Sequence, residues 1–382
     1  MPTKFFFPWL QVKQSFHIGA VNLIPYERGA RVSDCFDSTQ HVTDAILGNY
    51  GECLIGSPNG QPQEITRATI AEWQDDDASI ELTDEEIAER LNLGQWVAFS
   101  ALSCRRFGSH FGYCNADDLY FVAQRYDPTR PNVLATSMRR RDGSSVNYVS
   151  PQKYSPIFLR PPHSQASMID LNVPLINALC NIDDLDLRVK ILTAVSIFNR
   201  ANTDASGFSQ GSEITLMRVA FETLLETGFR AKALQDGFSS HFSLDMPNPS
   251  VWGIGKYPEA IWRGKYPKNV SRPLDAWVQD FCAVRNDNSH GVSGGSFYPA
   301  PIWSIHNHLL FSSWLFPLMV KKVLSDSGYY QLSDLDAECR ARGEEFFAHD
   351  VLAQDADGRL YWTLVEDEMR LRELGRALLT LL

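Results

Sequence analysis

The sequence predicts an α+β protein with a β-rich amino-terminal domain over residues 1–165, an all-α helical bundle over 166–330, and a small α/β carboxy-terminal appendage over 331–382. The length of 382 residues, with 44% hydrophobic and 12% aromatic residues, is enough for more than one hydrophobic core. Short apolar runs separated by turn signals fill the first part, which is typical of strands. Long apolar repeats at helical spacing fill the second part.

The amino-terminal part is divided into short segments by turn dipeptides such as Asp127-Pro128 and Asp142-Gly143. One stretch differs, because Glu72 to Glu89 contains nine acidic residues and no basic one. Within it, Thr83 and Glu86 have the spacing of a helix capping box. We therefore expect one acidic, solvent-exposed helix among the strands of this domain.

Four long helices are predicted in the second part from apolar residues three and four positions apart. Ser212 is the expected cap of the second helix, and the third begins near Ser271 with Pro273 tolerated in its first turn. The fourth is apolar nearly all round, as a central bundle helix should be. The predicted helices cover about residues 185–198, 212–225, 271–284 and 302–324.

The last fifty residues form an acidic appendage, with twelve acidic and six basic residues from 331 to 382. The run around Asp357-Gly358 resembles a β-hairpin turn. An amphipathic helix is expected at the carboxyl end.

Charge and cysteine content restrict the functional class. A net charge of −11 argues against wholesale coating of nucleic acid or anionic membranes, so any phosphate binding must be local. The seven cysteines are scattered and odd in number, which favours reduced thiols in the cytoplasm. The most apolar run, Leu309 to Val320, is shorter than the roughly 20 residues of a membrane span. We expect a cytoplasmic protein that has no membrane contact, metal or cofactor.

An arginine lies on the inward face of the third predicted helix. On a helical wheel Trp277, Phe281 and Val284 share a sector that also contains Arg285. A guanidinium is costly to bury alone, so Arg285 requires a carboxylate such as Glu222, a phosphate, or a subunit interface. His290 follows five residues later, about 140° away on a regular helix. The two positions would face one group only if the helix bends or a second copy completes the site.

The residues Arg285-Asn286-Asp287-Asn288-Ser289-His290, with the flank DAWVQDFCAVRNDNSHG and two helices upstream, resemble the Apea-like branch of the HEPN (higher eukaryotes and prokaryotes nucleotide-binding) family. The resemblance covers roughly residues 170–325. It implies a metal-independent endoribonuclease in which two helical bundles pair, so that both Arg-His sets line one cleft.

The resemblance also implies roles for three residues. His290 exchanges a proton with the RNA 2′-hydroxyl or the leaving oxygen, Arg285 holds the phosphate, and Asn286 orients both. Attack by the 2′-hydroxyl leaves a cyclic phosphate. Family analogy suggests a toxin or antiviral defence effector, with an activating ligand or inhibitor protein acting on residues 1–165. The alternative is a non-catalytic dimerisation or nucleotide-binding module.

A basic, aromatic stretch precedes the third helix. Residues 251–275 contain five basic and two acidic residues and repeat the sequence Gly-Lys-Tyr-Pro. Lysines for phosphates and aromatic rings for unstacked bases are typical of single-strand contacts. A connecting loop whose aromatic residues point inward is the alternative. The predicted RNA-binding residues are Lys256, Tyr257, Arg263, Lys265, Tyr266 and Lys268.

Three other patterns are weaker. Gly207 to Gly211 matches the G-x-S-x-G elbow of hydrolases, but no buried strand precedes it, and we interpret it as an interhelical loop. The cluster of Cys104, His110 and Cys114 lacks a C-x2-C pair for zinc. His306 and His308 are two residues apart on a helix and therefore diverge.

Overall fold

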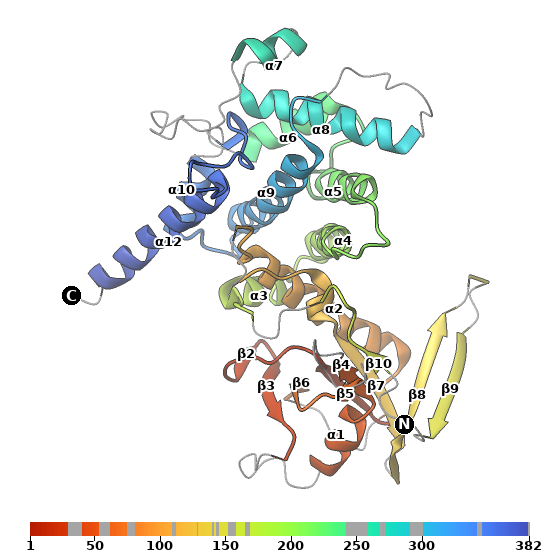
Figure 1. Cartoon of the computed structure of the whole chain (residues 1–382). Helices are drawn as coiled ribbons and strands as arrows, with labels where there is room; N and C mark the ends of the chain where they lie inside the picture. The colour runs from red at the N-terminus through yellow and green to blue at the C-terminus, as the bar shows by residue number, and fades with distance from the viewer. Residues whose placement is uncertain are drawn as a thin grey trace. The chain divides into compact units, whose positions relative to one another are not determined.

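The computed structural model describes residues 1–29, 40–52, 62–74, 81–108, 112–127, 129–139, 141–142, 145–151, 158–164, 169–241, 259–266, 270, 272–290, 301–341 and 346–380. The chain is mixed α+β, with the strands in its amino-terminal part and mostly helices after them, which confirms the predicted class (Figure 1). Contacts divide it into a first unit of residues 1–101 and 114–180, and a second of 102–113 and 181–382. Residues 331–382 fall within the second of these units.

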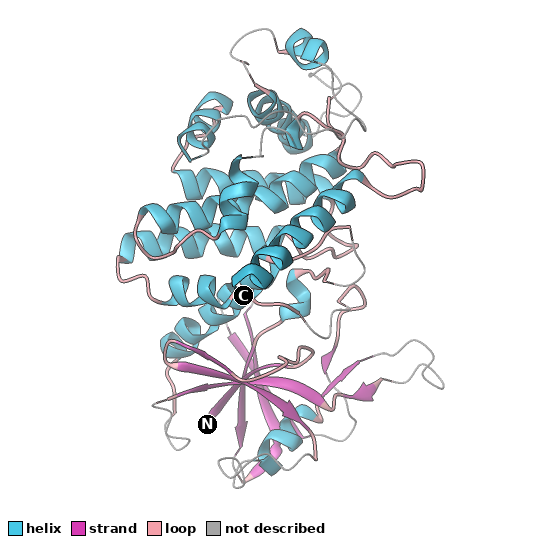
Figure 2. Cartoon of the chain, turned by 90° about the vertical axis from the view of Figure 1, so that its left-hand side faces the viewer, coloured by secondary structure: helices cyan, strands magenta, loops and turns pink. Residues whose placement is uncertain are grey.

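The first unit contains a seven-stranded sheet with the order β2-β3-β6-β1-β7-β8-β9, in which every neighbouring pair is antiparallel. The strands of this unit are magenta in Figure 2. A second, three-stranded sheet has the order β10-β4-β5. The strands of the first sheet are β1 (Thr3–Phe7), β2 (Phe16–Ile18), β3 (Val21–Glu27), β6 (Arg67–Trp73), β7 (Val122–Asp127), β8 (Arg130–Arg139) and β9 (Ser145–Pro151). Those of the second are β4 (Tyr50–Glu52), β5 (Gln63–Glu64) and β10 (Phe158–Leu159).

Strand β1 is buried on both faces, which explains its run of three phenylalanines. Phe6 belongs to a cluster with residues of α1 (Gln40–Leu47) on one face. Phe5 and Phe7 point to the other face, where both contact the ring of Phe121. There, the guanidinium of Arg90 in α2 (Asp84–Ser103) lies over the Phe5 ring. Since side chains alternate along a strand, only a central strand between two helical layers buries all three.

The predicted capping box begins α2. The Thr83 amide donates to Glu86 Oε2 at 2.7 Å, and the Glu86 amide donates to Thr83 Oγ1 at 3.2 Å. The expectation of a surface helix holds only for the first turns, since Trp96 and Phe99 in the second half are buried. The prediction was based on the acidic first turn of the helix and did not take its apolar second half into account.

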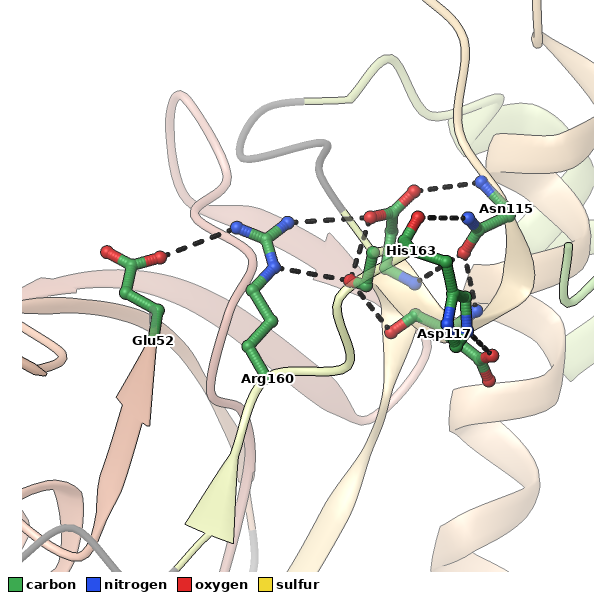
Figure 3. A network of polar contacts seen from close by, with 7 residues as sticks. Glu52, Asn115, Asp117, Arg160 and His163 are labelled. Carbon is green, nitrogen blue, oxygen red and sulfur yellow. Dashed lines mark hydrogen bonds and ion pairs between the residues drawn. The ribbon is translucent and has the colours of Figure 1, made fainter. Parts of the chain in front are cut away.

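A polar network ties three segments of the first unit together (Figure 3). Arg160, just after β10, donates to Glu52 of β4 at 3.5 Å and to Asp118 at 3.4 Å. Asp118 is buried in the 3-10 helix η2 (Ala116–Leu119) and also accepts from Ser164 Oγ at 2.9 Å. His163 hydrogen-bonds Asp117 at 2.5 Å. A buried carboxylate with this many donors holds the chain around it in one arrangement.

The named secondary-structure elements in the described part of the second unit are all helices. The four long predicted helices are confirmed, whereas the short ones, including α3 (Val173–Cys180) of the first unit, were not predicted. The helices of the second unit are α4 (Leu185–Ala201), α5 (Gln210–Leu225), α6 (Ala231–His241), α7 (Glu259–Lys265), α8 (Pro273–His290), α9 (Ile305–Asp326), α10 (Asp334–Ala341) and α12 (Tyr361–Thr380). Helix α7 lies inside the basic, aromatic stretch that precedes α8, where the sequence predicted no helix.

Aromatic residues form the centre of the second unit, where α5 packs against α4, α8 and α9 (Figure 1). The rings of Phe198 and Phe316 stack at 4.6 Å, and Phe221 meets Phe316 edge to face at 5.3 Å. Trp277 and Phe281 of α8 stack at 5.1 Å. All five side chains are fully buried, and α9 has the central position that its apolar sequence predicted. No helix within the described ranges combines the length and the apolar character that crossing a bilayer requires.

Two local predictions were wrong. Helix α5 is capped by Ser209, whose Oγ accepts from the Ser212 amide at 3.2 Å, so the cap lies three residues before the predicted one. The expected hairpin around Gly358 is a turn with a single bridge between Gln354 and Leu360. The chain then enters α12 at Tyr361, because Tyr361, Trp362, Val365 and Met369 share one buried helical face.

Candidate functional site

The Arg-His motif lies in the last turns of α8, which continues as a helix from Arg285 to His290. The helix does not end or fray before His290. On a regular helix, residues 285 and 290 lie about 140° apart around the axis. The side chain of His290 lies outside the described residues.

A buried arginine that sequence reasoning missed lies beside this motif. Arg218 of α5 is 1% exposed, and its Nε donates to Glu222 Oε1 at 2.8 Å. Its Nη1 donates to Asn286 Oδ1 at 3.4 Å, and its Nη2 donates to the Phe229 carbonyl. Glu222 thus pairs with Arg218. From the sequence, Glu222 was also a possible partner of Arg285, and that pairing is absent between these two described residues. The i, i+4 spacing of Arg218 and Glu222 was the signal that could have revealed this pair.

Arg285 has few partners in this arrangement. Its Nη1 donates to Asn286 Oδ1 at 3.2 Å, while its Nε is buried and has no hydrogen-bond partner among the described residues. None of the described carboxylates forms an ion pair with it. Of these two guanidinium groups, only that of Arg218 forms an ion pair with a carboxylate in the described part of the chain. Such a site favours an anion.

The thiol of Cys282 adjoins the same charges and is not a nucleophile. Burial raises the pKa of Cys282 to about 11, although the charges of Arg218 and Arg285 act in the opposite direction. Because a thiol with this pKa is protonated near neutral pH, Cys282 serves as a small packing residue.

The predicted RNA-binding residues are only partly described. Lys256, Tyr257 and Lys268 lie outside the described residues, and Arg263 is exposed on α7. Lys265 Nζ and the Tyr266 hydroxyl both donate to Asp280 Oδ1 at 2.6 Å. These two side chains therefore contact a carboxylate of their own chain, whereas the prediction assigned them to RNA.

Asp280 is the centre of a second polar network, fully buried on α8. Its Oδ2 accepts from the backbone amides of Ile302 at 2.9 Å and Trp303 at 3.1 Å, and lies 3.3 Å from His308 Nε2. Burial alone would raise the pKa of Asp280, but the donors from His308, Lys265 and Tyr266 outweigh it and lower this pKa to about 2. Burial lowers the pKa of His308, which favours a neutral imidazole. Asp280 and His308 have no exposed surface, so the network connects α7, α8 and α9 and does not form a reactive centre.

The weaker patterns also have structural explanations. Ser209 of the G-x-S-x-G match caps a helix and follows no strand in the described chain. His306 hydrogen-bonds Gln210, whereas His308 faces Asp280, so the two histidines diverge as expected. No group of His, Cys, Asp and Glu in the described part of the chain is arranged to hold a metal ion, and His110 lies outside it.

No protein-family model, curated protein or solved structure matches the chain. Conclusions about its function therefore depend on its own residues.

Proposed function

We propose that the protein is a metal-independent endoribonuclease of the HEPN type, which cuts RNA by attack of a 2′-hydroxyl on the neighbouring phosphate. The observation that carries the proposal is that Arg285 forms no ion pair with a described carboxylate. This guanidinium is partly buried, has no carboxylate partner among the described residues, and lies on the helix that ends at His290. A phosphodiester is an anion that such a group binds through charge-assisted hydrogen bonds.

Each residue of the motif has a defined role in this chemistry. Arg285 holds the phosphate and stabilises the charge that develops on its oxygens. His290 takes the proton of the 2′-hydroxyl or gives one to the leaving 5′-oxygen. Asn286 positions the Arg285 guanidinium and is itself held by the buried Arg218, whose contacts to Glu222 and Phe229 fix its own orientation. The products are a 2′,3′-cyclic phosphate and a 5′-hydroxyl end.

The helical separation of residues 285 and 290 supports a site shared by two copies. In a symmetric dimer through the second unit, Arg285 of one copy and His290 of the other would meet at one phosphate. The first unit would then recognise the trigger, an activating ligand or an inhibitor protein. By the same resemblance, the biological role is that of a toxin or antiviral effector.

One observation favours the alternative of a non-catalytic interaction module. Asn286 Oδ1 accepts hydrogen bonds from two arginines of its own chain, a contact that also connects α8 to α5. In that case Arg285 and Asn286 stabilise the helix pair, and a dimer would form without cutting RNA.

Labelled RNA distinguishes the two functions. We expect the protein in EDTA to produce cyclic-phosphate ends, and the Arg285→Ala and His290→Ala variants to cut at least about 100-fold more slowly. Arg200→Ala, which removes an exposed arginine from the end of α4, is the matched control and should retain full activity. Equal rates for His290→Ala and the parent, with both folded and of the same oligomeric state, would contradict the proposal.

A further inference from the structure

The described part of the second unit contains a pocket of about 380 Å³, within the size range of small-molecule sites. It lies where α4 ends and where α5 and α9 begin, and it shares no residue with the Arg218–Asn286 contacts. Its walls include aromatic, aliphatic and charged side chains, among them Arg105, Tyr113, Asp204, Phe208, Glu213 and His306. Nothing in the proposed RNA chemistry uses this pocket.

Contacts within the protein fix the guanidinium of Arg105, which lines this pocket. Arg105 is 7% exposed, and its Nη2 donates to Asn202 Oδ1 at 2.5 Å. The same guanidinium lies over the ring of Phe107, 4.5 Å from its centroid. Asn202 Oδ1 also accepts from Ser313 Oγ at 3.0 Å, which fixes the amide that holds Arg105. The positive charge of Arg105 is thus oriented by contacts within the protein.

Two carboxylates of the pocket form no ion pair with any described residue. Asp204 accepts a hydrogen bond from the Tyr113 hydroxyl, and half-buried Glu213 has no hydrogen-bond or ion-pair partner among the described residues. Neither carboxylate forms an ion pair with Arg105. Burial, together with the nearby charge of Asp204, raises the pKa of Glu213. The pocket therefore presents two carboxylates that form no ion pair with Arg105, the cation of its wall.

We infer that this pocket binds a small organic cation, with an amine or guanidine head at Glu213 and Asp204 and an apolar or aromatic body against Phe208 and the leucines of α9. The cation would supply the charge partner that both carboxylates lack. Phe208, Leu309 and Leu310 line the pocket and offer apolar contact to the rest of the ligand. This inference does not depend on the proposed RNA cleavage.

Calorimetric titration of the full chain with 2-phenylethylamine tests the inference. The matched probes are 3-phenylpropionamide, which is neutral, and 3-phenylpropionate, which is anionic. We expect the amine to bind with a Kd on the order of 1 mM, as suits a ligand of nine heavy atoms, and the other two at least about tenfold more weakly. Absence of amine binding, or similar affinity for all three probes, would overturn the inference. Preference for the neutral amide would indicate a site for an uncharged ligand such as a nucleobase.

Variants locate the binding and separate it from folding. Glu213→Gln should weaken amine binding about tenfold without lowering Tm, because Glu213 makes no hydrogen bond or ion pair with a described residue that the change would remove. Asp204→Asn is a second variant, since Asn tolerates the positive φ of 55° at this position and can still accept from Tyr113. Asp186→Asn removes an exposed carboxylate from the start of α4 and should leave affinity unchanged. Unchanged amine affinity in both pocket variants would refute the assignment of the carboxylates.

Discussion

Replacing Asp280 by asparagine removes one charge from a carboxylate that accepts hydrogen bonds at both oxygens. Oδ1 accepts from Lys265 and Tyr266, and Oδ2 from the amides of Ile302 and Trp303. In either orientation the asparagine NH₂ group therefore faces two donors. Loss of one partner in a buried charged network costs about 3–5 kcal/mol, so Asp280→Asn should destabilise the second unit by that amount at pH 7.

The pKa of Asp280 predicts how the stability difference between parent and variant changes at acid pH. The pKa of Asp280 is about 2 in the folded protein, below its ordinary value of 3.8. A lowered pKa means that the charge stabilises the fold above pH 3.8 and that this contribution disappears as the pH falls towards 2. The difference of 1.8 units corresponds to about 2.4 kcal/mol, of which about 1 kcal/mol is lost between pH 5 and pH 3. The variant, which cannot titrate at this position, should therefore approach the parent by about 1 kcal/mol over this interval.

Urea unfolding followed by tryptophan fluorescence measures both effects, because Trp277 and Trp303 are buried near Asp280. Asp186→Asn is the control, and we expect it to change stability by no more than about 0.5 kcal/mol. A stable Asp280→Asn variant would show that the network contributes little. A deficit that stays constant from pH 5 to pH 3 would show that the carboxylate charge is not its source.

Two further substitutions test the first unit. Gly94→Ala in α2 should destabilise this unit by about 1–3 kcal/mol, because the added Cβ would lie 2.6 Å from Phe121 Cβ. This overpacking outweighs the gain of about 1 kcal/mol in helix propensity. Increased resistance to urea would contradict the prediction. Arg160→Met should cost about 3 kcal/mol by leaving buried Asp118 without its cation, whereas Arg130→Met, which breaks an exposed pair, should cost less than about 1 kcal/mol. Equal losses in the two arginine variants, measured by thermal unfolding, would refute the difference in burial as the cause.

Local sequence was sufficient for the long helices. The repeats that place Phe198, Phe221 and Phe281 on inward stripes are visible in 15 to 20 consecutive residues, and all three are fully buried. The Thr83–Glu86 capping box is likewise a contact within four residues. Short helices such as α7 were missed because fewer than three turns give too little periodic signal.

Contacts between distant segments were harder to predict. Glu222 could pair with either arginine by charge alone, and the packing of α5 against α8 decides for Arg218. Lys265 and Tyr266 were predicted to contact nucleic acid, because their partner Asp280 lies 15 and 14 residues further along the chain. The pocket of Arg105 and Glu213 combines residues more than 100 positions apart and has no sequence signature.

The sequence by itself determined the α+β class and the positions of the long helices, because periodicity and capping depend on neighbours a few residues away. Only the tertiary structure decided which charges meet: Arg218 with Glu222, Asp280 with its donors, and Glu213 with no partner among the described residues. The physical reason is that ion pairs and buried hydrogen bonds act over a few ångströms, and only folding brings residues distant in the chain within that range.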